Sequence, residues 1–392
     1  RVRNRPPPRG GGQQAVSGLT AALAAFWPTE LIWTERKTQA SELVRVHGQT
    51  VTASVVPNRW LQRRVGRWLR RCLGVADPDV ASMLCSGGNR RLVAYLEAVC
   101  QDGDVLLLAH PWLWPAARKV RTKRRLLLVY DAHNVEHRLK HEAYGTSRCG
   151  NWVVDRVRRL ESELIGSADL TLACTRSDAA ALAALAGVSA ERFLIGSKGI
   201  ALSRVADAIA QARRERACGR IALFVGSEHP PNNEAARWII ETLAPARPDW
   251  RFIIAGGCGP RAGVSPRTAN VHVLGIVDDL HELLIDADIA LNPVSQGSGI
   301  NMKLFEYQQC ALPVLSTPFG ARGFEELAET GIVLAERERF ASELDTIVAD
   351  PERLRRLGTA GVACIRDHFT WPTIGQRVHA RIDALLARPG GA

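Results

Sequence analysis

The stretch Leu291–Thr317 holds the residues whose types and spacing best suit a defined chemistry. Gly297 and Gly299 lie in a loop of small residues, where a ligand can approach the backbone closely. Lys303 follows in the first turn of a predicted helix, where a cation does not stabilise the helix unless an anion such as phosphate is bound nearby. Glu306 lies three residues later on the same face, and its carboxylate could accept two hydrogen bonds from a sugar diol. The pattern predicts a nucleotide site, although a surface helix with solvated Lys and Glu explains it about as well.

The elements that position these residues are predicted as strand, loop, helix and strand. Apolar runs at 287–293 and 313–316 flank the loop and the helical pattern. Ligands of open parallel sheets bind beyond the carboxyl ends of the strands, so this loop is expected to form a pocket. Further hydrogen-bond donors predicted in the loop are Ser298, Ile300 and Asn301.

Residues 297–323, GSGINMKLFEYQQCALPVLSTPFGARG, resemble the donor-site segment of the family 4 glycosyltransferases (glycosyl transferases group 1), which have the GT-B fold. The resemblance implies that Glu306 binds the ribose of a nucleotide-diphosphate sugar, which acts as co-substrate. The first glutamate of the family's E-x7-E pattern is replaced by Ser298, as in a branch that carries Gly-Ser-Gly. No Asp-x-Asp pair suits a divalent metal, so neither a metal nor another cofactor is expected, and Lys303 is assigned a catalytic role with the leaving diphosphate.

A second loop, after the apolar strand 221–225, supplies Gly226, Ser227 and Asn232 as donor-binding candidates. Relatives of this family usually have an Arg and a Lys after this glycine, and this loop has neither. We therefore expect Lys303 and the helix N-termini to neutralise the diphosphate. Residues 257–262 also fit G-x-G-x-x-A, but Pro260 argues against the helix that a dinucleotide fingerprint requires, so we interpret this match as accidental.

Polar residues also follow two apolar strands in the first half of the chain. His110 follows the run 105–109, and Asp131, His133, Asn134 and Glu136 follow the run 126–130. A lone histidine at a strand end is often only a capping or packing residue, but a cluster of this kind favours function. DAHNVEHRL also resembles a family segment that borders the transferred sugar, which implies a catalytic role for His133.

The N-terminal run RPPPRGGG precedes a helical pattern and includes Gly11 and Gly12. Glycines before a helix could cradle an anion, and a flexible tail is the alternative. The run resembles the loop after the first strand in the same family. In that case the first strand would lie mostly before Arg1.

Charge is uneven along the chain. Residues 1–200 hold 30 Lys and Arg against 17 Asp and Glu, whereas residues 201–392 hold 21 against 23. The run 59–73 predicts a basic amphipathic helix that could lie on an anionic membrane, although a domain helix with a solvated basic face is slightly favoured. A second basic run, 118–125, could extend that surface, and no motif indicates nucleic acid.

Nine cysteines without a C-x-x-C pair, no apolar run of transmembrane length and no visible signal peptide favour a reducing cytoplasm, including the inner face of the membrane.

Alternating strands and helices predict an α/β protein. The resemblance implies the GT-B architecture, with a cleft between two Rossmann-like domains and a C-terminal helix that crosses back. We expect an acceptor-side domain at 1–205, a nucleotide-sugar domain at 219–370, and the crossover helix and tail at 371–392. The predicted function is a retaining, metal-independent hexosyltransferase whose acceptor is a glycan, including lipid-linked and cell-envelope glycans. A nucleotide-sugar epimerase of GT-B shape and a non-catalytic nucleotide-binding partner stay open as alternatives.

Overall fold

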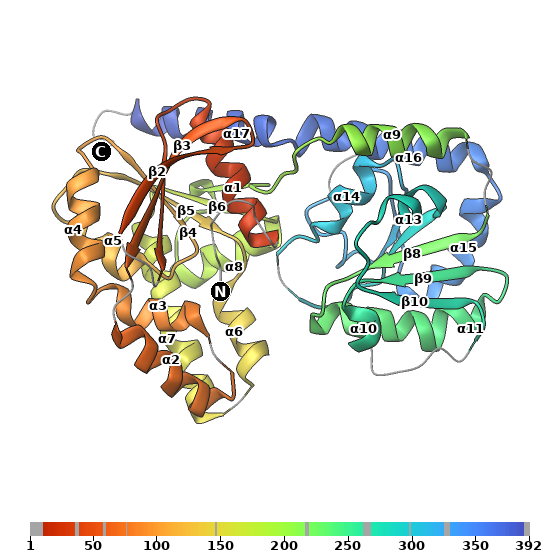
Figure 1. Cartoon of the computed structure of the whole chain (residues 1–392), viewed down its shortest axis with the longest axis horizontal. Helices are drawn as coiled ribbons and strands as arrows, with labels where there is room; N and C mark the ends of the chain where they lie inside the picture. Colours follow the sequence, from red (N-terminus) through yellow and green to blue (C-terminus); the bar gives the residue numbers. More distant parts are fainter. Residues whose placement is uncertain are drawn as a thin grey trace. The chain divides into compact units, whose positions relative to one another are not determined.

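The computed structural model of the chain describes residues 11–35, 39–57, 60–75, 77–145, 147–215, 219–261, 268–297, 299–324 and 330–387. The chain forms two compact units (Figure 1). The first combines Arg1–Gly199 with Trp371–Ala392, and the second is Ile200–Thr370. Each unit has a parallel sheet with apolar clusters on both faces, which confirms the predicted α/β class with two Rossmann-like sheets.

The parallel sheet of the first unit has the order β4-β5-β6-β7. Strand β5 is buried at every position because helices cover both faces of the sheet. Asp131 still belongs to this strand, so the predicted polar cluster begins inside the sheet rather than after it. The strands are β4 (Val105–Ala109), β5 (Leu127–Ala132), β6 (Leu170–Ala173) and β7 (Phe193–Ile195).

A separate sheet with the order β1-β3-β2 precedes it in the chain, where the sequence predicts at most mixed, strand-like structure. β1 (Glu30–Glu35) pairs in parallel with β3 (Gln49–Pro57), and β2 (Ala40–Val46) pairs with β3 as a hairpin. His47 and Gly48 connect the hairpin with φ of 45° and 86°. Two positive φ values match the twist of a tight hairpin, so this turn sets the register of β2 on β3.

The helices of the first unit pack around these sheets. Side chains of Asp77, Asn89, Ser147 and Thr175 cap the N-termini of α3, α4, α7 and α8. The second basic run lies on α5 and the turn after it. The helices are α1 (Gly11–Ala24), α2 (Trp60–Leu73), α3 (Pro78–Ser86), α4 (Arg90–Val99), α5 (Trp114–Arg121), α6 (Glu136–Tyr144), α7 (Arg148–Ser167), α8 (Arg176–Ala186) and α17 (Trp371–Leu386), with a 3-10 turn at Ala190–Arg192.

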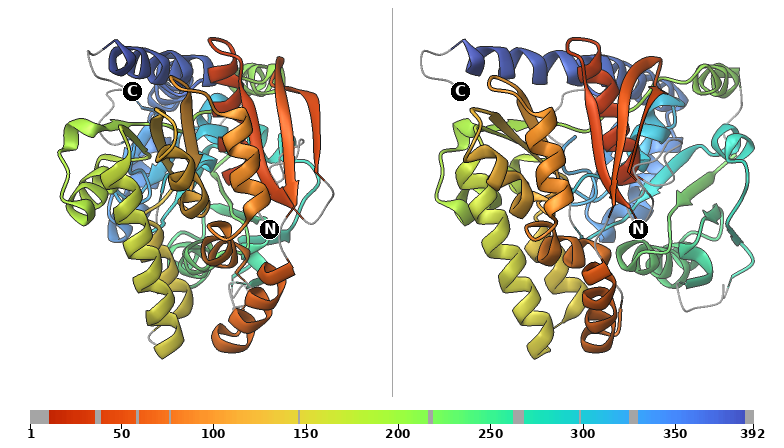
Figure 2. Two further views of the ribbon diagram at one scale, coloured as in Figure 1. Left: turned by 90° about the vertical axis from the view of Figure 1, so that its left-hand side faces the viewer. Right: turned by 60° about the vertical axis from the view of Figure 1, so that its left-hand side comes forward.

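The C-terminal helix α17 belongs to the first unit and lies against α1 (Figure 2). The fit is close because two glycines face the partner helix. A Cβ added to Gly18 would lie 1.9 Å from the Trp371 ring, and one on Gly375 would lie 2.8 Å from Cβ of Ala22. The predicted return of the C-terminal helix to the first domain is therefore confirmed.

The second unit has one parallel sheet with the order β10-β9-β8-β11-β12-β13. Alternate residues of its strands enter two different cores: Phe224 and Phe252 pack on one face, and Leu223 and Ile253 on the other. This is the doubly wound arrangement of a Rossmann-like fold. The strands are β8 (Ile221–Val225), β9 (Arg251–Ala255), β10 (Val271–Gly275), β11 (Ile289–Asn292), β12 (Val314–Ser316) and β13 (Ile332–Leu334).

Three predictions from the helical pattern of this unit are corrected. The pattern predicts a helix at 234–242, but the helix begins at Pro230, because proline suits the first helical position. The pattern also predicts a helix at 277–286, but that helix begins at His281. A one-turn helix covers Cys258–Arg261, where none was predicted. Pro260 is tolerated there because a single turn has no backbone hydrogen bond that needs the N–H of this residue. The helices are α9 (Arg204–Glu215), α10 (Pro230–Trp238), a π turn (Ile239–Leu243), α11 (Ala244–Ala246), α12 (Cys258–Arg261), α13 (His281–Asp286), α14 (Lys303–Gln309), a 3-10 turn (Arg337–Arg339), α15 (Phe340–Val348) and α16 (Pro351–His368).

None of the helices in the described part of the chain combines the length and the apolar character needed to span a bilayer.

Candidate functional site

Three loops of the second unit converge where strands β8, β9 and β11 end. A Cβ on Gly256 would lie 2.2 Å from the carbonyl oxygen of Gly226, and Gly256 has φ of 95°. Cys258 N donates to the same carbonyl at 3.1 Å. Gly226 itself touches the side chains of Cys258 and Asn232. These close approaches are possible only because both positions are glycine.

Lys303 begins α14 and points into this convergence. Its Nζ donates to Oδ1 of Asn232 at 2.9 Å and lies 4.3 Å from the centre of the Phe224 ring. The Asn232 amide in turn donates to the Ser227 carbonyl at 3.2 Å. Burial lowers the pKa of Lys303 to about 8, because no carboxylate bonds to the ammonium group. The structure thus brings together four residues that were predicted to bind the nucleotide-sugar donor or its diphosphate: Gly226, Ser227, Asn232 and Lys303.

Glu306 lies one turn further along α14. Its side chain reaches the surface, yet the surrounding atoms exclude enough water to raise the pKa of its carboxyl, an effect that Lys303 partly offsets. No hydrogen-bond partner ties this carboxylate down among the described residues. It can therefore accept hydrogen bonds from a ligand diol.

The loop before α14 runs beside the start of α10. Gly297 and Gly299 have φ of 121° and 68°, and a Cβ on Gly297 would lie 3.4 Å from Pro231. Ile300 is half-buried against the core, and the Asn301 amide donates to the Gly320 carbonyl at 2.7 Å, so both positions brace the loop. Ser298 lies outside the described residues.

Arg322 is a candidate that the sequence reasoning missed. Its Nη2 lies 4.0 Å from where a Cβ of Gly297 would be, so a buried cation adjoins the glycine loop. Nη1 donates to the Phe319 carbonyl at 2.8 Å, and the guanidinium lies over the Phe319 ring at 4.2 Å. The run PFGARG was part of the resemblance, and its arginine was the available signal.

The helix N-termini supply fewer donors than predicted. Helix α10 begins with Pro230 and Pro231, which have no N–H. In α14 the amides of Leu304 and Phe305 already donate within the first turn, at 3.0 and 3.1 Å. The predicted anion binding would therefore depend more on cationic side chains than on the N–H groups of these two helices.

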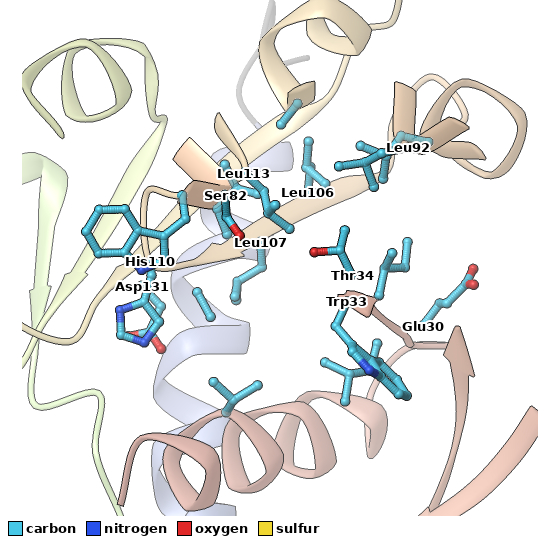
Figure 3. Close-up of a pocket in the computed structure, with 18 of the residues that line it drawn as sticks. Glu30, Trp33, Thr34, Ser82, Leu92, Leu106, Leu107, His110, Leu113 and Asp131 are labelled. Carbon is cyan, nitrogen blue, oxygen red and sulfur yellow. The ribbon is translucent and has the colours of Figure 1, made fainter. Parts of the chain in front are cut away.

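A second cluster lies at the strand ends of the first unit. His133 Nε2 is 2.9 Å from Asp131 Oδ2, and Lys198 Nζ donates to Asp131 Oδ1 at 2.7 Å. His110 Nδ1 is 2.9 Å from Glu136 Oε1, and the two histidine rings are 4.2 Å apart. Figure 3 shows His110 beside Asp131 where β4 and β5 end.

The two histidines have opposite electrostatic environments. Burial lowers the pKa of His133 to about 4, and the nearby Lys198 charge adds to this effect. Burial would also lower the pKa of His110, but the hydrogen bond to Glu136 and the charges of the nearby carboxylates together outweigh burial and raise the pKa. A neutral His133 that donates from Nε2 to Asp131 carries its lone pair on Nδ1.

Asp131 and Glu136 are fully buried and hold the histidines rather than facing solvent. Burial would raise the pKa of Asp131, but the charges and hydrogen bonds of Lys198 and His133 together outweigh burial and hold the pKa well below its ordinary value. The same competition, with His110 as the partner, lowers the pKa of Glu136. An epimerase needs free acid and base carboxylates, and these two are occupied. Asn134 is half-buried beside them.

Lys198 is a second residue that sequence reasoning missed. It is only 4% exposed and follows β7, just before the second unit begins at Ile200. Ser197 Oγ also donates to Asp131, at 3.2 Å. A lysine in a short polar loop gave no periodic signal, and only the position of the loop beside β5 explains its burial.

The N-terminal glycines are placed differently from the prediction. Gly11 and Gly12 form the first turn of α1 instead of a loop before it. Nothing lies within 4 Å of a Cβ built on Gly12. The role of these glycines as an anion cradle stays a prediction.

For α2 the slightly favoured alternative, a domain helix with a solvated basic face, agrees with the structure. Leu69 is fully buried, and Val65 and Leu73 pack against the same core, so this apolar face is covered by the unit itself. Trp68 is 44% exposed and contacts Trp152 edge-on. The exposed arginines of α2 are Arg63, Arg64, Arg67, Arg70 and Arg71.

Half of the basic residues in the second basic run form ion pairs within the unit. Arg118, Arg121 and Lys123 pair with Glu163, Asp169 and Glu97. Part of the charge of this run is therefore compensated, whereas the arginines of α2 are exposed.

The comparisons with known proteins point to one family. Residues 219–350 match the family model described as glycosyl transferases group 1. The match lies within the second unit. Over most of its length the chain is similar to the D-inositol 3-phosphate glycosyltransferase of Segniliparus rotundus, with 26% identity over 348 residues that cover 81% of this chain and 74% of that protein.

A shorter similarity joins the chain to the GDP-mannose-dependent monoacylated alpha-(1-6)-phosphatidylinositol monomannoside mannosyltransferase of Corynebacterium glutamicum. The two are 28% identical over 148 residues, 34% of this chain and 39% of that protein. Two solved structures share the fold of the whole chain. Anabaena Alr3699/HepE in complex with UDP and glucose has a TM-score of 0.65 at 15% identity and 98% coverage of both chains. Sucrose-phosphate synthase from Thermosynechococcus elongatus has a TM-score of 0.66 at 16% identity, covering 97% of this chain and 94% of that one. The chain therefore has the GT-B fold.

Proposed function

We propose that this chain transfers a hexose from a nucleotide-diphosphate sugar to an acceptor, with retention of configuration. The observation that carries the proposal is the convergence at the strand ends of the second unit. There Lys303 is held by Asn232 beside two glycine loops, inside the segment that matches the group 1 family. The solved relative described with UDP and glucose supports a nucleotide sugar as donor.

In the proposed arrangement the diphosphate lies on the loop that contains Gly297 and Gly299. Lys303 and Arg322 approach this loop, and their charges compensate the diphosphate as the glycosidic bond breaks. Glu306, one turn along α14, accepts hydrogen bonds from the ribose hydroxyls. The second cation offsets the absence of Arg and Lys from the Gly226 loop.

In the first unit, we propose that His133 hydrogen-bonds the transferred sugar. The pair of Asp131 and Lys198 fixes the imidazole in one orientation, and its low pKa keeps it neutral. Asp131 and Glu136 act as positioning residues because neither side chain is accessible. His110 orients the neighbouring ring at 4.2 Å.

The acceptor we propose is anionic and carries a phosphorylated polyol, free or lipid-linked. One relative is named for D-inositol 3-phosphate and another for a phosphatidylinositol mannoside. The excess of Lys and Arg in residues 1–200, and the exposed arginines of α2, fit such an acceptor. A lipid-linked acceptor would place the protein at the inner face of a membrane, which sedimentation with anionic against neutral liposomes tests directly.

The first experiment is thermal stabilisation by UDP, GDP, ADP, CDP and TDP. A nucleotide at about 100 times its dissociation constant should stabilise the protein by about 2.7 kcal/mol. Glu306→Ala should abolish the shift, whereas Glu241→Ala, an exposed glutamate in the π turn after α10, should not. If no nucleotide stabilises the wild type, the donor site is wrong.

A nucleoside control separates phosphate from ribose binding. Lys303→Met and Arg322→Gln should lower the affinity for the nucleotide diphosphate far more than the affinity for the matching nucleoside. Glu306→Ala should lower both affinities. Turnover with inositol phosphate or phosphatidylinositol acceptors then distinguishes a transferase from a protein that only binds nucleotides.

A further inference from the structure

Two thiols of the first unit lie together near its surface, on helices α2 and α7. Cys72 is exposed in the last turn of α2, and Cys149 is half-buried in the first turn of α7. This pair combines access to solvent with a second thiol close by, which is what reversible oxidation of cysteine requires. The other cysteines that the structure describes are all buried: Cys85, Cys100, Cys174, Cys258, Cys310 and Cys364.

The packing of α2 against α7 brings the two thiols together. The two helices lie side by side (Figure 1). Leu69 of α2 shares a core with Val153 and Val157 of α7. At the rim of this core, the rings of Trp68 and Trp152 meet edge-on with their centres 5.8 Å apart. This ring contact fixes which turn of α2 faces which turn of α7.

The two cysteines lie one helical turn from this ring contact. Cys72 is four residues after Trp68, and Cys149 is three residues before Trp152. Residues three or four apart share one face of a helix, so the faces that meet at the tryptophans also meet at the cysteines, with the helices running in opposite directions. A side-chain hydrogen bond joins Cys72 and Cys149. Burial raises the pKa of the Cys149 thiol, and this hydrogen bond raises it further.

We propose that Cys72 and Cys149 form a reversible disulfide when the protein meets a peroxide. The bridge joins the C-terminal end of α2 to the N-terminal end of α7, and thiol reductants reopen it. The two residues are far apart in the sequence, so no C-x-x-C motif or other local pattern reveals the pair. The proposal does not depend on the proposed sugar transfer.

The exposed Cys72 reacts first. Its thiolate attacks one oxygen of hydrogen peroxide, the O–O bond breaks, and the other oxygen leaves as water after protonation, so Cys72 becomes a sulfenic acid. The Cys149 thiolate then attacks the sulfur of Cys72. The S–S bond forms, the S–O bond breaks, and the second oxygen leaves as water. The two thiols are oxidised by two electrons, the peroxide is reduced to two molecules of water, and both thiol protons end in that water.

The bridge fixes a helix that is otherwise held by one apolar face. Leu69 packs into the core of the unit, whereas Arg67, Arg70 and Arg71 are exposed. The segment between the two cysteines contains helices α3 to α6 and strands β4 and β5. A cross-link that closes so long a segment restricts the unfolded chain strongly, and it therefore stabilises the folded unit.

The test oxidises the full chain with a small molar excess of hydrogen peroxide and blocks the remaining thiols with iodoacetamide. Tryptic peptides are then mapped by mass spectrometry. Trypsin cuts after Arg71 and Arg148, so the bridge should join peptide 72–90 to peptide 149–156. Dithiothreitol should separate the two peptides. We also expect the oxidised first unit to melt about 5–10 °C higher than the reduced one.

Peptide 72–90 also contains the buried Cys85, which provides a matched control. The cross-linked peptide and the melting shift should persist in Cys85→Ala. Both should disappear in Cys72→Ser and in Cys149→Ser, and these two variants should melt like the reduced wild type with or without peroxide.

Three outcomes overturn the proposal. The first is a cross-link that survives Cys72→Ser, which assigns the bridge to Cys85. The second is a cross-link found only between two chains, seen as a dimer on a non-reducing gel that is lost when the protein is diluted before oxidation. The third is recovery of Cys72 as a free thiol or a sulfinic acid while Cys149 still reacts with iodoacetamide, which shows that the two sulfurs do not join.

Discussion

At the carboxyl ends of its strands, the first unit gathers ionisable side chains, whereas the second gathers glycines. Asp131, His133 and Lys198 contact one another in the first unit and are almost completely buried. In the second unit, Gly226 and Gly256 touch through their backbones. Both edges belong to parallel sheets of Rossmann-like type, so the topology alone does not decide what a strand edge can do.

The two edges differ in what their polar groups bond to. In the first unit these groups satisfy one another, which fixes side-chain positions and makes every partner necessary. In the second unit, the missing side chains leave room for a ligand, and Lys303 keeps a lowered pKa because no carboxylate bonds to it. The first edge fixes side-chain positions, and the second fits the anion binding that we propose. Four measurements test this difference.

The largest effect is expected from Asp131→Ala. It leaves Lys198, 4% exposed, as a buried charge without its carboxylate, and we expect a loss of about 3–5 kcal/mol in the stability of the first unit. Urea unfolding followed by hydrogen exchange in β5 measures it. Asp207→Ala, which removes an exposed partner of Arg366, should change stability little. A similar small effect from both variants would contradict the buried-pair interpretation.

Gly256→Ala should give the next largest effect. The added Cβ meets the Gly226 carbonyl, and φ of 95° is unfavourable for alanine, so a cost of about 1–3 kcal/mol is expected. Nucleotide binding should weaken as well, because the two loops move apart. Gly166→Ala, in α7 with open space around it, is the matched control and should be neutral or slightly stabilising. Unchanged melting of Gly256→Ala would show that the loops are not tightly packed.

Nucleotide-diphosphate affinity should depend on the charge of Lys303. Because the pKa of Lys303 in the free protein is about 8, the side chain is charged below that pH and neutral above it. Only the charged form attracts the diphosphate. We expect the affinity to fall about tenfold per pH unit above pH 8, until the higher pKa of the complex is passed. Titration calorimetry from pH 7 to 10 measures this. Lys303→Arg should remove the dependence, and an unchanged slope in that variant would assign it to another group.

The smallest effect is the pH dependence of stability in the first unit. The pKa of His133 is lower in the folded protein than in the unfolded chain, where it is about 6.5. Below that pH the unfolded chain takes up the proton more readily, so His133 destabilises the fold by about 1 kcal/mol between pH 7 and 5.5. His110 has a raised pKa, so the stability it adds is complete below about 6.5 and is lost as pH rises through the folded value. The two contributions oppose each other in the wild type.

Single variants separate the two histidines. His133→Asn should make stability less sensitive to acid than the wild type, and His110→Asn should make it more sensitive. Melting temperatures from pH 5 to 8 measure both. Parallel curves for the three proteins would mean that neither histidine has a perturbed environment.

The regular part of this fold was predictable because its signals are local. Strands β4, β8 and β9 fall on their predicted residues, since each is a short apolar run between polar turns. Glycine-rich loops and the helix that carries Lys303 and Glu306 follow from the same kind of pattern. The resemblance to the group 1 family added the return of α17, which no local signal indicates.

What the sequence did not indicate depends on contacts between distant residues. Lys198 is 67 positions from Asp131, and Arg322 is 25 positions from Gly297. Only the order of the strands brings the two residues of each pair close together. The sequence only slightly favours a core-facing over a membrane-facing stripe for α2, and burial of Leu69 shows that the stripe faces the core. Helix α3 and helix α4 carry caps at Asp77 and Asn89 that the periodicity alone did not reveal.

The glycine-to-tryptophan contact between α1 and α17 has a consequence for synthesis on the ribosome. Helix α1 emerges before the second unit, but Trp371, which fills the notch at Gly18, is made only after that unit. The second unit is continuous in sequence and can fold while α1 still waits for its partner. We therefore expect the usual N-to-C order to be inverted, so that a nascent chain arrested near residue 370 exposes the leucines of α1 to chaperones.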